Sequence, residues 1–334
     1  MAKHIKDTDY LAISARIRAM EPQLVTKERM ERVLEAHTDE EAAKLLQECG
    51  YPDLDLSTPE TMDASLLAAR QEMLSDLSGG VPDEGFLNIF KLKYDYHNLK
   101  ALLKARLAGV SAAHILMDLG RVSAAELTDA VEQGEYDALP PILAAAAAEG
   151  KAVLDTTRDA QLMDLTLDRW YYRDMTDAAA ATGSEFLRGY VRIQIDAVNL
   201  RALVRTLRMG KNADFLRQVL IEGGTLAPEE LLAVSAQGGS GLAELYASTA
   251  FAAAAESGAA ALRGGTLTEF EKRCDDAVSA YLSDARFVPF GEQPVVAYLA
   301  ARESEYTNLR ILLLGRSMGL APDVIRSRLR ESCI

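Results

Sequence analysis

Few residues in this chain combine the types and spacing that enzymes use for chemistry. The four histidines, His4, His37, His97 and His114, form neither a His-Glu-x-x-His motif nor a Cys/His spacing that holds zinc. The sequence also lacks Gly-x-x-x-x-Gly-Lys-[Ser/Thr], the loop that cradles nucleotide phosphates, and it lacks Gly-x-Gly-x-x-Gly. These absences predict a protein without a catalytic site, a cofactor or a metal ion.

Two further clusters have residue types that suit ligand binding but lack the full pattern. Asp275-Asp276 is similar to part of the aspartate-rich motif of helical prenyl-transfer enzymes, but Ser279 stands where a third aspartate is needed to hold Mg²⁺. The run Trp170-Tyr171-Tyr172 has the aromatic types that stack on nucleic-acid bases. It lies beside Asp168 and Asp174 in an acidic chain, which favours packing in the protein core.

One group of polar residues occurs three times at identical spacing. Counted from an asparagine, an acid stands three residues before it and a base two after it. Leucine follows at four, a small residue at seven and glycine at eleven. The asparagines are 101 and 109 residues apart, and six matched positions indicate an internal repeat. The acid, asparagine and base are Asp95, Asn98 and Lys100 in the first copy, Asp196, Asn199 and Arg201 in the second, and Glu305, Asn308 and Arg310 in the third.

The spacing of the repeat predicts its structural setting. The offsets −3, 0, +4, +7 and +11 lie on one face of an α-helix, so each copy presents its acid, amide, leucine and small residues along one stripe. The acid and the asparagine are expected to satisfy backbone or arginine groups at a helix junction. An acid, an asparagine and a base in a single copy could form an active site, but three equivalent copies favour a structural junction. The glycines at +11, expected to end each helix in the left-handed conformation, are Gly109, Gly210 and Gly319.

A second pattern recurs at the same period and extends each repeat to a module. Residues 24–30, 121–127 and 225–231 are similar, and in them Thr26 and Ser123 are expected to be helix N-caps. Ser123 and Glu126 are expected to form a capping box, and Pro228 suits a first helical position. Acidic helices are expected over residues 59–77, 159–181 and 268–284. We predict three helical modules: residues 1–120, which include an N-terminal helix, 121–223 and 224–334.

The composition sets the fold class and excludes several kinds of partner. The 334 residues are 49% apolar, contain runs of alanine and lack alternating strand-like segments, which predicts an all-α fold. A net charge of −14 disfavours nucleic acid and anionic membrane surfaces. No apolar run reaches the roughly 18 residues of a direct membrane span, and no signal peptide is recognised. Three unpaired cysteines, Cys49, Cys274 and Cys333, suit a reducing cytosol, so we expect the protein in the cytoplasm.

Charge is segregated along the chain. Residues 86–110, 186–217 and 294–334, which contain the three copies, are each net positive although the whole chain is acidic. One interpretation is that each basic helix docks on the acidic helix of its own module. The other is that the basic faces, including Lys100, Arg201 and Arg310, converge to receive an acidic partner. The sequence leaves both interpretations open.

The segments around the first and third copies carry the most specific local motifs. Residues 289–299 read Pro-Phe-Gly-Glu-Gln-Pro-Val-Val-Ala-Tyr-Leu, and residues 302–310 read Arg-Glu-Ser-Glu-Tyr-Thr-Asn-Leu-Arg. Together they resemble the closing block, P-F-G-x-E-P and then E-x-x-N-L-R, of the C subunit of V-type (A/V-type) ATPases, the counterpart of the eukaryotic d subunit. Gln293 departs from the usual glutamate of that block. Residues 86–104 resemble the family's F-L-x-x-K-x-Y-D-x-x-N-L-K, and similarity extends over almost the whole chain.

The resemblance implies a funnel of three similar helical domains with pseudo-threefold symmetry. It implies that the wide end rests on the membrane proteolipid ring and that the hollow receives the axle subunits of the central stalk. The protein would then transmit torque for H⁺ or Na⁺ transport without catalysis, and no partner-contact residues carry over. One alternative is a helical-repeat adaptor that binds peptides, but solenoid repeats are usually shorter than about 45 residues. A helical enzyme is the other, and it would need a unique polar cluster in one module.

Overall fold

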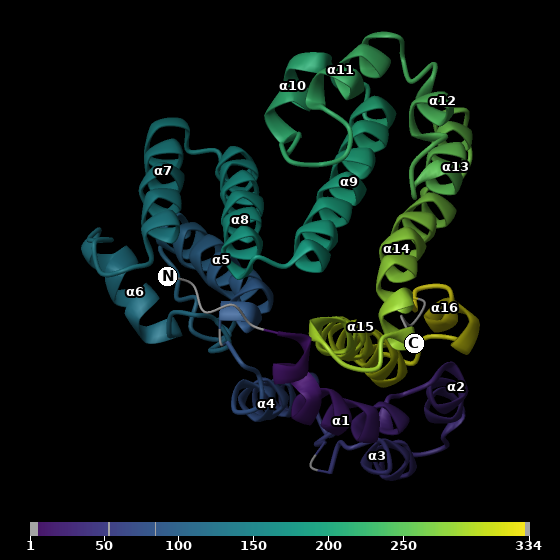
Figure 1. Cartoon of the computed structure of the whole chain (residues 1–334). Helices are drawn as coiled ribbons and strands as arrows, with labels where there is room; N and C mark the ends of the chain where they lie inside the picture. Colours follow the sequence, from purple (N-terminus) through teal and green to yellow (C-terminus); the bar gives the residue numbers. More distant parts are fainter. Residues whose placement is uncertain (1–5, 53, 84, 331–334) are drawn as a thin grey trace. The chain divides into compact units, whose positions relative to one another are not determined.

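The structure is a computed structural model that describes residues 6–52, 54–83 and 85–330 (Figure 1). Within these ranges all regular structure is helical and no strand occurs, which confirms the predicted all-α class. None of the described helices combines the length and apolar character that a membrane crossing requires. The chain divides into two compact units, residues 1–82 with 278–334 and residues 83–277, which are described separately below.

The first unit packs N-terminal helices around α15 (Glu292–Ser317), which carries the third copy of the repeat (Figure 1). The α15 helix contacts α1, α2, α4 and α16, and it buries apolar side chains such as Val295, Leu309 and Leu312. Removing that apolar surface from water stabilises the unit by about 25 cal/mol per Å². The other helices are α1 (Leu11–Met20), α2 (Lys27–Glu35), α3 (Asp39–Gln47), α4 (Pro59–Ser78) and α16 (Pro322–Arg326), with short 3₁₀ turns at Asp7–Tyr10, Glu21–Gln23 and Asp284–Phe287.

The second unit holds the first two copies of the repeat, on α5 (Gly85–Ala108) and α9 (Glu185–Arg208). The α5, α7 and α8 helices pack on one another, and α9 packs against α8, α10, α11 and α13 (Figure 1). The remaining helices are α6 (Ala124–Gln133), α7 (Pro141–Thr157), α8 (Ala160–Thr182), α10 (Ala213–Val219), α11 (Pro228–Ala236), α12 (Leu242–Tyr246), α13 (Ala252–Leu262) and α14 (Leu267–Ser283), of which Ala277 is the last residue in this unit.

Local sequence signals fix where these helices begin. The hydroxyls of Thr26 and Ser123 accept hydrogen bonds from the third helical N–H, Ser123 and Glu126 form a capping box, and Pro228 opens α11. These predictions are confirmed. The three expected acidic helices also agree with α4, α8 and α14 to within one residue. The division into three modules stays a prediction.

The aromatic cluster on α8 is only half-buried, so the expectation of core packing for it is right in part. Trp170 donates its indole N–H to Glu149 at 2.8 Å, and the Tyr171 ring meets the Tyr96 ring edge-on at 5.5 Å. The three side chains therefore pack within the unit rather than forming an open stacking platform. Among the cysteines, Cys49 and Cys274 are buried free thiols. Cys333 and His4 lie outside the described residues.

Candidate functional site: three repeat junctions

The acid and the asparagine of every copy are buried, although both side chains are strongly polar. Each copy lies on one of the three long helices α5, α9 and α15, so its members share one helix face. A buried polar side chain needs hydrogen-bond partners, because leaving it unpaired costs about 1 to 3 kcal/mol. We call the set of these contacts a repeat junction. In a repeat junction the acid and the asparagine of one copy bind backbone groups of other segments of the chain, and the segment that the acid binds leads into a short helix.

Each asparagine makes the same pair of hydrogen bonds with one backbone residue. Its Oδ1 accepts from the N–H of that residue, and its Nδ2 donates to the carbonyl oxygen of the same residue. Both bonds lie between 2.7 and 3.0 Å in all three copies. The side-chain amide thus pairs with both backbone groups of one residue, as a neighbouring β-strand would, and holds that residue against the repeat helix. The pairs are Asn98 with Met117, Asn199 with Ile221, and Asn308 with Arg330.

Each acid accepts hydrogen bonds from backbone N–H groups just before a short helix. Asp95 accepts from Arg121 at 2.9 Å and from Val122 at 3.2 Å, two residues before α6 begins. Asp196 accepts from Thr225 at 2.7 Å, before α11. These segments belong to the second sequence pattern, so the two patterns meet in space. The prediction that acid and asparagine satisfy backbone groups at a helix junction is confirmed.

The third copy completes its junction with the other end of the chain. Glu305 accepts from the N–H of Val25, immediately before the Thr26 cap of α2, while Asn308 binds Arg330. Relative to α15, Val25 takes the place that Val122 takes relative to α5. The backbone N–H group that binds the acid therefore comes from the N-terminal segment in the third copy, whereas in the first two copies it comes from the chain that follows the repeat helix.

The three buried acids differ in how their charge is compensated. Arg121 bridges Asp95 and Asp174 in the first junction, with N–O distances of 2.7 and 2.8 Å. In the third junction Glu305 pairs with buried Arg302 and accepts from the hydroxyl of Tyr51. Within the described part of the chain, Asp196 forms no ion pair, and its hydrogen bonds come from Thr225 and from the backbone N–H of Leu226. Burial raises the pKa of all three carboxyl groups, and these hydrogen bonds and arginines oppose the rise.

The raised pKa of Asp196 predicts how stability depends on pH. A carboxyl group with a higher pKa in the folded protein than in the unfolded chain favours folding when protonated. Its contribution is complete below the unfolded pKa and is lost as pH rises through the folded pKa. We therefore expect the stability of the parent chain, relative to Asp196→Asn, to fall as pH rises from about 4, the ordinary pKa of an aspartate, through the raised pKa of the folded protein. Urea denaturation over that range measures it, with exposed Asp177→Asn as control. A relative stability that rises with pH would contradict the prediction.

The bases of the three copies pair with residues of the three acidic helices. Lys100 on α5 pairs with Asp168 on α8, and Arg201 on α9 pairs with Glu271 and Asp275 on α14. With the module boundaries predicted above, each acid lies in the module that follows its base. If those boundaries hold, these ion pairs join neighbouring modules rather than helices of one module. The third pair, which joins α15 to α4, is Arg310 with Asp63 at 2.7 Å.

Charge reversal at these bases should have unequal effects. The Arg201 side chain is 19% exposed and faces two acids, whereas Arg310 and Asp63 are 57% and 41% exposed. We expect Arg201→Glu to lower the free energy of unfolding by about 3 kcal/mol and Arg310→Glu by about 1 kcal/mol, because water screens the exposed pair. Urea denaturation measures both. Equal losses would contradict this view, and a folded Arg201→Glu chain with weakened affinity for an acidic partner would instead favour convergence of the basic faces.

The end of each repeat helix is built from the predicted glycine. Gly109, Gly210 and Gly319 have φ values of 68°, 63° and 68°, which confirms the left-handed conformation. In every copy the N–H of the residue after the glycine donates to the carbonyl oxygen of the small residue at +7, at 2.9 to 3.0 Å. This bond is that of a Schellman motif, and it satisfies a carbonyl group that the helix leaves unpaired.

Two further glycines let the chain approach the buried acids. A Cβ atom built on Gly120 would lie 2.1 Å from Oδ1 of Asp95, and one on Gly224 would lie 2.4 Å from Oδ1 of Asp196. No side chain fits at such distances, so glycine at these positions allows the backbone N–H groups to reach the carboxylates.

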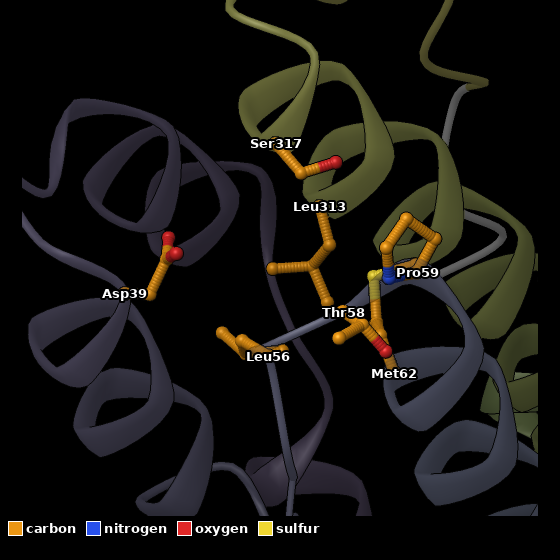
Figure 2. A pocket seen from close by; sticks show the side chains of 7 residues that line it. All are labelled: Asp39, Leu56, Thr58, Pro59, Met62, Leu313 and Ser317. Carbon is orange, nitrogen blue, oxygen red and sulfur yellow. The ribbon is translucent and has the colours of Figure 1, made fainter.

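A small cavity lies beside the third copy of the repeat. Figure 2 shows Leu313 of α15 among Met62 and Pro59 of α4, Leu56 and Asp39, around a cavity of only about 10 Å³. That volume is near the minimum for one water molecule. Among the described residues, no three His, Cys, Asp or Glu side chains are placed to hold a metal ion. The polar groups of the repeat are engaged in holding chain segments together.

Sequence reasoning missed several members of the junctions. Arg121, Asp174, Arg302 and Tyr51 complete the buried networks, yet none of them recurs in all three copies. Gly120 stands immediately before one aligned segment of the second pattern, as Gly224 does before another, and this recurrence was a usable signal. The pairing of Glu305 with Val25 joins residues 280 apart, and no local pattern indicates it.

Comparisons with known proteins agree with this structural interpretation. The family described as ATP synthase (C/AC39) subunit matches residues 13–328 of the chain. The C subunit of the V-type sodium ATPase of Enterococcus hirae is 23% identical over 97% of this chain and 98% of its own length. The C subunit of the A-type ATP synthase of Methanocaldococcus jannaschii is 26% identical over 96% of this chain and 86% of its own. The C subunit of the V-type ATP synthase of Thermus thermophilus is 26% identical over 93% of this chain and 95% of its own length. The chain belongs to the ATP synthase (C/AC39) subunit family, and as a V/A-type ATPase C subunit it is a structural stalk component rather than a catalytic one.

Proposed function

We propose that this chain is the central-stalk component that couples the axle of a rotary ATPase to the proteolipid ring of its membrane sector, for transport of H⁺ or Na⁺. The observation that carries the proposal is the family match over residues 13–328, together with relatives whose own lengths are covered almost completely. The chain acts on the cytoplasmic side of the membrane and is peripheral to it.

The repeat junctions support a mechanical role. A part that transmits torque must resist deformation, and buried hydrogen-bonded polar networks hold helices in one arrangement. In each copy two buried side chains fasten the repeat helix to the segment that leads into another helix, and the third copy is fastened to the N-terminal segment. This pattern supports three modules, residues 1–120, 121–223 and 224–334, arranged as a funnel with pseudo-threefold symmetry.

A binding experiment tests the two contacts together. The purified chain, the detergent-solubilised proteolipid ring and the axle subunits from the same organism are mixed and sedimented through a density gradient. We expect the axle subunits to sediment with the ring only when the chain is present, and the chain to bind each partner alone. Axle subunits that bind the ring equally well without the chain would overturn the proposal. A chain that binds neither partner but binds peptides would favour the adaptor function.

A further inference from the structure

In the first copy, the stretch of chain between the asparagine and the backbone residue that it binds is three residues shorter than in the other two copies. Asn98 binds a residue 19 positions ahead, whereas Asn199 and Asn308 bind residues 22 positions ahead. The acids show the same difference, because Asp95 reaches 26 positions ahead to Arg121 and Asp196 reaches 29 to Thr225. Three residues are almost one turn of an α-helix.

In the longer copies this stretch forms a short helix that fills the space beside the repeat helix. Residues 214–217 read Asp-Phe-Leu-Arg on α10, and residues 323–326 read Asp-Val-Ile-Arg on α16. Leu216 and Ile325, seventeen residues after their asparagines, are 0% and 1% exposed. The α10 helix packs against α9 and α11, and α16 packs against α15. Arg326 also pairs with Glu31 of α2 at 2.8 Å.

In the first copy the corresponding space is an open groove. The stretch after α5 forms no helix before α6, and a groove of about 460 Å³ lies between these two helices. In this stretch Val110, which lines the groove, is 64% exposed, and Ile115 is 43% exposed. The third copy keeps a recess of about 370 Å³ at the end of α2, but there Ile325 already forms one wall. The apolar lining of the open groove includes Leu102, Ala105, Ala112, Leu116 and Val131.

The rim of the groove keeps one of the two glutamates that face Arg326 of the short helix α16, and Thr128 stands at the place of the nearer one, Glu31. Counted from the N-caps Thr26 and Ser123, Glu132 on α6 takes the place of Glu35 on α2. Glu35 lies 3.7 Å from Arg326 of the short helix α16. Glu132 is exposed, lines the groove and, among the described residues, forms no ion pair. The groove therefore has an apolar floor and, on its rim, Glu132 in the position that faces the arginine of the short helix in the third copy. Ala236 holds that position in the second copy. Arg106 also lines the groove, where it donates to the carbonyl oxygen of Val131.

We propose that this groove binds one helical turn of a partner protein that presents a leucine or isoleucine followed by arginine or lysine. The partner's turn would take the place of the short helix that the first copy lacks. The apolar residue would enter between α5 and α6, and the base would pair with Glu132. This inference rests on the repeat and the groove alone, so it holds or fails independently of the coupling function.

A peptide of this chain's own second copy is the direct probe. Residues 211–222, Lys-Asn-Ala-Asp-Phe-Leu-Arg-Gln-Val-Leu-Ile-Glu, carry equal numbers of acidic and basic side chains, which limits nonspecific attraction to the acidic protein. We expect the fluorescently labelled peptide to bind the full chain saturably, with a Kd on the order of 100 μM. The Leu216→Asp peptide should bind at least tenfold more weakly. Fluorescence anisotropy measures both.

Two chain variants locate the binding site. Ala113 is exposed and lines the groove, so Ala113→Trp should block it and abolish binding without disturbing the core. Ala138→Trp, in the exposed turn between α6 and α7, is the matched control and should bind normally. The Glu132→Lys chain should bind the unaltered peptide severalfold more weakly. The same chain should regain binding with the Arg217→Glu peptide, because the charges of the pair are then exchanged. Absence of saturable binding at millimolar peptide, or binding that survives Ala113→Trp, would overturn the proposal.

Discussion

Replacing Gly120 with alanine is expected to lower the free energy of unfolding by about 3 kcal/mol. The new methyl group would lie 2.1 Å from Oδ1 of Asp95 and 3.1 Å from the carbonyl oxygen of Val122. Asp95 is fully buried and accepts hydrogen bonds from the backbone and side chain of Arg121. Moving its carboxylate away would leave a buried charge and buried N–H groups without partners. Urea denaturation followed by circular dichroism measures the loss.

Two other glycines provide the comparison for this substitution. Gly224→Ala should have a similar cost, because its Cβ would lie 2.4 Å from Oδ1 of Asp196. Gly79→Ala should leave stability within about 0.5 kcal/mol, because Gly79 has a right-handed φ of −69° and its nearest neighbour is 4.0 Å away. A Gly120→Ala chain as stable as Gly79→Ala would show that the approach of this loop to the acid is not required.

Replacing Glu305 with alanine is expected to cost about 4 kcal/mol of unfolding free energy. Glu305 is 4% exposed and is bound at once by the N–H of Val25, the hydroxyl of Tyr51 and the guanidinium of Arg302. Its loss leaves Arg302, itself 7% exposed, as an unpaired buried charge. It also releases the N-terminal segment from α15. The measurement is again urea denaturation.

A double variant separates the buried charge from the shape of the junction. Arg302→Met with Glu305→Leu removes both charges while filling a similar volume, so it should regain most of the loss that Glu305→Ala causes. Arg302→Met alone should remain strongly destabilised. If the double variant were no more stable than Glu305→Ala, the hydrogen bonds to Val25 and Tyr51, and not the paired charge, would account for the cost.

The sequence predicted the local parts of the fold because local signals determine them. Helix starts at Thr26 and Ser123 follow from side-chain hydroxyls that can cap nearby N–H groups, and helix ends at the +11 glycines follow from the left-handed φ that a helix end needs. The burial of Asn98 and its counterparts was predictable because the same face recurs three times.

The partners of the repeat were harder to predict because they lie far away in the sequence. Any of the three acidic helices offers aspartates to Arg201, so charge alone does not select α14 over α8. The ion pairs that complete the junctions use residues found in one copy only, such as Arg121 and Asp174. The shortened first copy was visible in the spacing between the two patterns, but the groove beside α6 depends on packing.

The most direct test of the coupling account is ion uptake driven by ATP in membrane vesicles from cells that lack this chain. The account predicts that such vesicles show no ATP-driven uptake of H⁺ or Na⁺, and that adding the purified chain restores uptake in proportion to the ATP hydrolysed. Vesicles without the chain that accumulate as many ions per ATP as complete vesicles would contradict it.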